Sequence, residues 1–306
     1  KTVALKAATS AAKPNEAFVV LKVVGTGHYK IYLDGTERAT YNAGTGGDVD
    51  AIVADLAADI DGNTFGTTTF SATVVGPGIY ISADAAFTIE VVGAPSEDAM
   101  FVFQESTPAV ADLPTQCKDG YVVKVVNSID VDVDDMYVKF IADSGATYGT
   151  GVWEETIAPG IKYEFDELTM PHQLVRQADG SFTYGPVDWE DRLVGDDTTN
   201  PTPSFIGNTI NSTFFYNNRF GVLSEDNIIF GVANDAYNFF AKSALTQIDS
   251  DPIDLSVSSV RPVVLSDVLP SPQGLTIFSA RQQFQVFAPN ASTITPSSAV
   301  VRSLSN

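Results

Sequence analysis

The stretch DVDAIVADLAADI, residues 48–60, decides how the first part of this chain is interpreted. Its apolar residues Ile52, Leu56 and Ile60 recur every four positions, which places them on one face of an α-helix. Asp48 stands where an N-cap residue belongs, and Asp61-Gly62 supplies a stop. The stretch predicts a helix, and it is the one convincing helical pattern in the sequence.

Strand-like segments lie on both sides of this helix. They are rich in β-branched and aromatic residues and are divided by glycine, proline and aspartate, which is typical of strands joined by turns. They are AFVVLKVV (17–24), HYKIYL (28–33), FSATVV (70–75), GIYISA (78–83) and FTIEVVG (87–93). Residues 1–113 therefore predict an α+β domain of strands, helix and strands, in which the helix covers one face of a small sheet.

The remainder of the chain has the pattern of an all-β protein. The proline-bearing stretch ESTPAVADLPTQ (105–116) indicates a boundary, after which short strands alternate with turn residues. Examples are MYVKFIA (136–142), GVWEETI (151–157), KYEFDEL (162–168) and SFTYGPV (181–187). We expect a small β domain at 114–190 and a further β region at 191–306, with the architecture of a sandwich or a propeller. No clean repeat period distinguishes these two.

The charge and cysteine content exclude several classes of protein. Against 38 Asp and Glu the chain has 17 Lys and Arg, a net charge of −21, which disfavours tight binding of nucleic acid phosphates. Solubility alone is an equally good reason for this acidity. Cys117 is the only cysteine, so no intrachain disulfide forms and a reducing compartment is expected. The sequence contains no membrane-spanning run and no signal peptide pattern, and a start at Lys1 indicates a piece of a longer protein.

The segment MPHQLVRQADGSF (170–182) contains one of the two histidines. Asp179-Gly180, between apolar runs, is a signal for a two-residue β-hairpin turn, and this explains Asp179 without catalysis. His172 stands at the start of the hairpin, and we favour a structural role for it. The sequence contains no G-x-S-x-G motif, and Cys117 has no basic setting that would lower the pKa of its thiol.

Metal and glycosidase sites receive little support. DVDVDD (130–135) resembles the start of a calcium loop, but Asp135 replaces the turn glycine and Ile141 the bidentate glutamate, which leaves at most a weak surface site. His28 and His172 lack zinc-site partners. Carboxylates near Trp153 and Trp189 could form a glycosidase pair, although so acidic a chain places acids beside aromatics by chance. These carboxylates are Glu154, Glu155, Asp188, Glu190 and Asp191. No catalytic, cofactor-binding or metal-binding residue is assigned.

Five motifs follow one another in the second half of the chain. They are MPHQLVRQADGSF (170–182), TNPTPSFIGNTI (199–210), FFYNNRFGVLSEDNIIF (214–230), NDAYNFF (234–240) and DSDPIDLSVSS (249–259). In this order they resemble the nozzle proteins, also called tail tubular proteins B, of short-tailed (podovirus) bacteriophages. The resemblance is specific between Met170 and Phe287, looser over 120–168 and only architectural over 1–113.

The resemblance implies a structural virion protein and not an enzyme. It implies a mainly β fold whose region 191–306 contains part of a β-propeller. Six copies would form a tube below the tail adaptor protein (tail tubular protein A). Viral DNA would pass through this tube without sequence-specific binding, and tail fibres would dock on it. The tail would be assembled in the cytoplasm of the bacterial host. No catalytic residue, cofactor or small-molecule substrate is implied, and the family's chains are longer than this one.

Several residues acquire expectations from this interpretation. A channel that lets DNA slide needs a negative wall, so a lumen lined by cations would contradict it. The cations concerned are Arg38, Arg176, Arg192 and Lys242. Arg219 and the segment 251–254 are expected to fix strand ends and turns, with contact between subunits as the alternative. The α+β domain is expected to serve as a platform for tail fibres.

Two alternatives of other classes remain open at this point. A surface adhesin or carbohydrate-binding module would use exposed aromatics such as Tyr29, Tyr32 and Tyr41 as its binding face. An acid-dyad hydrolase would depend on one of Glu154, Glu155, Asp188 or Glu190.

Overall fold

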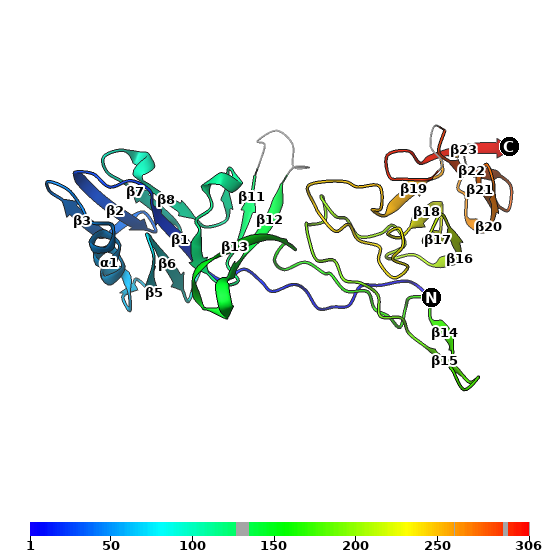
Figure 1. Ribbon diagram of the computed structural model, residues 1–306, viewed down its shortest axis with the longest axis horizontal. Coiled ribbons are helices and arrows are strands. Elements are labelled where there is room, and N and C mark those ends of the chain that lie inside the picture. Colours follow the sequence, from blue (N-terminus) through cyan, green and yellow to red (C-terminus); the bar gives the residue numbers. More distant parts are fainter. Residues whose placement is uncertain (127–134, 260, 290–292, 306) are drawn as a thin grey trace. The chain divides into compact units, whose positions relative to one another are not determined.

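A computed structural model describes residues 1–306 except 127–134, 260, 290–292 and 306 (Figure 1). The chain forms two compact units, which are Ala11–Thr156 and the combination of Lys1–Ser10 with Ile157–Asn306. We call them the layered unit and the motif unit, because the second contains all five sequence motifs. The mainly β fold is confirmed, and α1 (Val49–Ile60) is the one α-helix in the described residues. No described helix is long and apolar enough to cross a membrane. The domain boundaries expected at residues 113 and 190 remain predictions.

The described residues of the layered unit form three sheets. The first has the order β4 (Thr64–Phe65), β5 (Thr68–Val75), β6 (Gly78–Ala83), β1 (Glu16–Leu21) and β8 (Met100–Phe103). The second has the order β3 (Thr36–Ala43), β2 (Gly27–Leu33) and β7 (Ile89–Val92). The third has the order β10 (Gln116–Lys118), β13 (Tyr148–Thr156), β12 (Met136–Ala142), β11 (Val122–Val125) and β9 (Ser106–Thr107). Short 3-10 helices lie at Glu97–Ala99, Val110–Asp112 and Asp143–Gly145.

Strand β1 is the centre of the layered unit because both of its faces are buried. Ala17, Val19 and Leu21 pack in one core with α1 and the second sheet, whereas Phe18 and Val20 pack in another core with the third sheet. A strand covered on both faces needs a continuous apolar run, and this explains why AFVVL lacks alternation. Helix α1 begins one residue after the predicted N-cap, but the Asp48 side chain makes no capping hydrogen bond.

In the part of the motif unit that the structure describes, the strands form two four-stranded antiparallel meanders and one separate hairpin. The meanders are β16 (Ile210–Tyr216), β17 (Arg219–Ser224), β18 (Asn227–Phe230) and β19 (Ile253–Ser256), and then β20 (Leu265–Ser271), β21 (Gly274–Ser279), β22 (Gln283–Phe287) and β23 (Val300–Ser305). The hairpin is β14 (Gln173–Arg176) with β15 (Phe182–Gly185). One core joins the meanders through residues such as Phe230 and Phe284, and Phe165, Trp189 and Phe205 pack in a second core.

Two local predictions in the motif unit were wrong. KYEFDEL (162–168) is not a strand, because the segment that it faces, Lys1–Ser10, makes only isolated bridges with it, at Leu5–Phe165 and Thr9–Lys162. The turn of the β14–β15 hairpin is one residue longer than predicted. Gln177 and Ser181 are still hydrogen-bonded, which leaves a three-residue loop in which Gly180 adopts a positive φ of 88°.

Candidate functional site

The β14–β15 hairpin is the most exposed apolar feature of the motif unit. Leu174 is 64% exposed, Phe182 60% and Tyr184 71%. Leu174 lies opposite Tyr184 and Arg176 lies opposite Phe182, so these four side chains share one face of the hairpin. Figure 1 shows the hairpin apart from the meanders of its unit. A two-stranded sheet is marginally stable by itself in water, so a partner surface would stabilise it.

His172 lies at the foot of this hairpin and has the contacts of a structural residue. Its Nδ1 is 3.1 Å from the carbonyl oxygen of Met170, and its ring stacks on Tyr184 with centroids 5.3 Å apart. Asp179 accepts hydrogen bonds from the backbone N–H and hydroxyl of Ser181 within the turn. These contacts account for His172 and Asp179 as parts of the hairpin.

An acid-lined cavity of about 590 Å³ lies in the same unit. Its charged lining residues are Lys6, Glu164, Glu167, Asp188, Glu190 and Asp191. Lys6 Nζ lies 2.9 Å from Glu164 Oε2 and 3.1 Å from Glu167 Oε2. The hydrogen bond from Lys6 lowers the pKa of Glu164, whereas burial, followed by the charge of Glu164, raises the pKa of Asp191. The cavity therefore has an excess of negative charge that Lys6 does not balance.

The carboxylates proposed as a hydrolytic pair are divided between the units. Glu154 and Glu155 lie on β13 of the layered unit, whereas Asp188, Glu190 and Asp191 line the cavity of the motif unit. Trp153 donates its Nε1–H to the Pro114 carbonyl at 2.8 Å and packs on Phe140. Trp189 is only 7% exposed. Both tryptophans pack against cores, so neither is a freely exposed ring, although Trp189 lines the acid-lined cavity.

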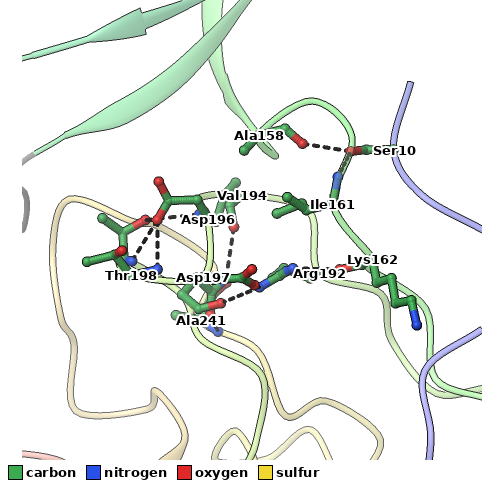
Figure 2. A network of polar contacts seen from close by, with 12 residues as sticks. Ser10, Ala158, Ile161, Lys162, Arg192, Val194, Asp196, Asp197, Thr198 and Ala241 are labelled. Carbon is green, nitrogen blue, oxygen red and sulfur yellow. Dashed lines mark hydrogen bonds and ion pairs between the residues drawn. The ribbon is translucent and has the colours of Figure 1, made fainter. Parts of the chain in front are cut away.

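Arg192 organises the loop at 192–200 from inside the protein (Figure 2). It is 1% exposed, and its Nη1 donates to the Asp197 carboxylate at 2.8 Å and to the Asn200 carbonyl at 3.1 Å. Nη2 donates to the Lys162 carbonyl. Asp196 accepts the backbone N–H groups of Thr198 and Thr199 at 2.9 and 3.0 Å. A residue buried in this way does not line a channel. Arg192 therefore contributes no positive charge to a channel wall.

Arg219 performs the same task in the first meander, as expected from the sequence. It is 2% exposed, and its guanidinium donates to the carbonyl oxygens of Gly231, Asp249, Ser250 and Asp251. Burial lowers the pKa of Arg219. The carboxylates at 251 and 254 accept the backbone N–H groups of Ile248 and Ser204, both at 2.8 Å. The expectation that these residues fix strand ends and turns is confirmed.

The other singled-out residues have structural surroundings. Cys117 is buried, and burial raises the pKa of its thiol to about 12, so the reactive thiolate is scarce at neutral pH. Asp135 is buried and pairs with Lys124 at 2.7 Å, whereas 130–134 lie outside the described residues. Within the described ranges no group of three or more His, Cys, Asp or Glu could hold a metal ion.

The proposed aromatic binding face was wrong at Tyr29, whereas Tyr32 and Tyr41 are partly buried. Tyr29 is fully buried and donates its hydroxyl to the Ala94 carbonyl, while Tyr41 packs partly buried against the same core. Alternation along β2 turns Tyr29 inward, toward α1 and the first sheet. The surface that the carbohydrate-binding alternative required is therefore absent at Tyr29.

Sequence reasoning found part of the acid-lined cavity. It singled out Asp188, Glu190 and Asp191 but not Glu164, Glu167 or Lys6. Lys6 is distant in sequence and reaches the cavity because the segment Lys1–Ser10 bridges to residues 162, 165 and 206. No local pattern in the sequence indicates that pairing.

Comparisons with known proteins agree with the order of the motifs. The model of the bacteriophage nozzle protein family matches residues 1–306. The tail tubular protein gp12 of Escherichia phage T7 is 38% identical over 176 residues, which are 58% of this chain and 21% of that protein. The chain thus spans about a fifth of the length of the curated relative that it matches.

Proposed function

This chain belongs to the bacteriophage nozzle protein family, and we propose that it is part of a structural protein of a short-tailed phage tail. Six copies would form a tubular channel through which viral DNA leaves the virion. The observation that carries the proposal is the family match over residues 1–306. The protein would be assembled in the host cytoplasm and reside in the virion tail, with no catalytic activity and no small-molecule substrate.

The charge of the chain supports a channel that does not hold DNA. A net charge of −21 repels phosphates, and DNA binding requires exposed Lys and Arg. Arg192 is buried, Arg38 lies over the ring of Phe65, and Lys242 faces Asp235 at 3.5 Å. Burial of Arg192 and the pairing of Lys242 with an aspartate leave fewer unpaired cations for DNA phosphates, which favours sliding of DNA along a negative wall.

The two meanders support a partial β-propeller in the motif unit. Each is a four-stranded antiparallel sheet, which is the unit of a propeller blade. Further blades would come from other parts of a longer chain. We propose the tail adaptor protein and the tail fibres as partners, with the α+β domain at 1–113 as the platform for the fibres. Fibre binding that survives deletion of residues 15–106 would contradict the platform.

Mass determination and electron microscopy of the purified full-length parent protein, with and without the adaptor protein, test the proposal. Six-fold rings with an open centre are the expected result. A monodisperse monomer under both conditions would overturn it. A glycan array on that monomer would then test the carbohydrate-binding alternative.

A further inference from the structure

We propose that the β14–β15 hairpin of one copy inserts into the acid-lined cavity of a second copy. The inserted face carries Leu174, Arg176, Phe182 and Tyr184. The inference rests on the proposed ring and names the contact that builds it.

The hairpin face has the composition of an interface that lacks its partner. Two exposed aromatic side chains and a leucine surround one arginine, and aromatic residues and arginine are the types enriched in protein interfaces. Neither β14 nor β15 pairs with a third described strand. A marginal two-stranded sheet with an apolar face is stabilised when a surface covers that face.

Arg176 gives this face a positive charge that is free to pair. It is exposed and takes part in none of the ion pairs found among the described residues. The one carboxylate of the hairpin, Asp179, is held by Ser181 in the turn. In a chain with a net charge of −21, an exposed arginine on an apolar face complements an acidic surface.

The cavity has the complementary properties. Five carboxylates line it, and its one lysine, Lys6, already contacts Glu164 and Glu167. Asp188 and Glu190 are exposed at its wall, beside Leu193, an exposed apolar residue. Trp189 also lines the cavity, and its buried Nε1–H has no hydrogen-bond partner in the described structure. A volume of about 590 Å³ accommodates large side chains such as arginine and tyrosine.

The hairpin face and the acid-lined cavity are two different surfaces of the motif unit. This difference determines the kind of assembly that they can form. A contact between unlike surfaces is head-to-tail, and head-to-tail contacts close into rings when the rotation between copies permits. The same contact made reciprocally about a two-fold axis would occupy both hairpins and both cavities and would stop at a dimer, so a ring requires the head-to-tail arrangement. The proposed contact therefore suits a ring of subunits.

Crosslinking of two single-cysteine variants tests the contact directly. Gln177→Cys marks the end of the hairpin strand and Leu193→Cys marks the cavity, both at exposed positions. The native Cys117 is buried and does not compete for a maleimide. A short bismaleimide added to an equal mixture of the two variants should give covalent dimers, whereas each variant alone should give none.

A charge exchange supplies the second measurement. Arg176→Glu should raise the concentration needed for half assembly about tenfold or more, and Glu190→Arg on the same chain should restore assembly. Arg281→Glu, another exposed arginine of the motif unit, is the matched control and should leave assembly unchanged. Circular dichroism of each variant verifies that it is folded.

The outcomes separate the contact from the proposed function. Rings that form without mixed crosslinks, or that tolerate Arg176→Glu, overturn the hairpin contact and leave the nozzle function standing. Crosslinks in Gln177→Cys alone indicate a symmetric contact and also overturn it. A chain that forms no oligomer, with or without adaptor, overturns both proposals.

Discussion

The layered unit and the motif unit both consist of short strands, but different interactions hold the strands together in each. In the layered unit, apolar side chains on both faces of β1 hold three sheets and α1 together. In the motif unit, buried arginines also bind the carbonyl groups of long loops, Arg192 at 192–200 and Arg219 at 249–251. Loops contain backbone groups that no sheet satisfies, so particular side chains must satisfy them.

This difference makes the two units unequally tolerant of substitution. An apolar strand core tolerates exchanges among Val, Ile, Leu and Phe, whereas an arginine that bonds four carbonyls has no equivalent substitute. YNNRFG contains Arg219 and DSDPID contains three of the carbonyl groups that it binds, and both belong to the motif unit. The two tryptophans allow the comparison to be tested, because Trp153 lies in the layered unit and Trp189 in the motif unit. The fluorescence of each tryptophan can report the unfolding of its own unit when the other tryptophan is changed to Phe.

The largest expected effect is on the layered unit. Phe18→Ala removes a fully buried ring from the core between β1 and the third sheet, and we expect a loss of about 4 kcal/mol in the free energy of unfolding. Urea unfolding followed by Trp153 in a Trp189→Phe background measures it. A loss below about 1 kcal/mol would break the claim that β1 is central.

Arg219→Met should destabilise the motif unit by about 3 kcal/mol, because buried carbonyl groups lose their donor. Trp189 fluorescence in a Trp153→Phe background measures the effect during urea unfolding. Arg281→Met, at an exposed position, is the control and should change stability by less than about 0.5 kcal/mol. Equal effects of both substitutions would contradict the role of the buried arginine.

Asp196→Ala should cost about 1 kcal/mol, because the N–H groups of Thr198 and Thr199 lose their acceptor. Asp235→Ala is the matched control, since its contact with Lys242 is a surface ion pair worth about 0.5 kcal/mol or less. The same Trp189 measurement distinguishes the two variants. Equal losses of stability in the two variants would show that Asp196 does not stabilise the loop.

The smallest expected effect is a pH dependence of the motif unit. Burial raises the pKa of Asp251 and Asp254 above 3.8, so these two groups bind more protons in the folded unit than in the unfolded unit while they titrate. Their contribution to stability should therefore fall as pH rises through the raised pKa values, whereas the lowered pKa of Glu164 contributes in the opposite direction. Asp254→Asn should make this decline shallower in Trp189 unfolding curves. A steeper decline would contradict the assigned direction.

The sequence predicts the two units unequally. The helix at Val49–Ile60 was predicted to within one residue, because its period depends only on local residues. The hairpin was predicted at the right place, but its loop, closed by the hydrogen bond between Gln177 and Ser181, is one residue longer than the predicted turn. KYEFDEL looked like a strand, and only its distant partner Lys1–Ser10 shows otherwise. The cavity was found in part for the same reason, because Lys6 reaches it through tertiary contacts.

Electron cryo-microscopy of the assembled particle tests the central claim most directly, since it reveals both the ring and the wall of its channel. The account predicts a ring of six copies whose open centre is lined by Asp and Glu, with Arg176 placed against the neighbouring copy. A channel lined by Arg38, Arg176 or Lys242, or a particle without an open centre, would contradict it.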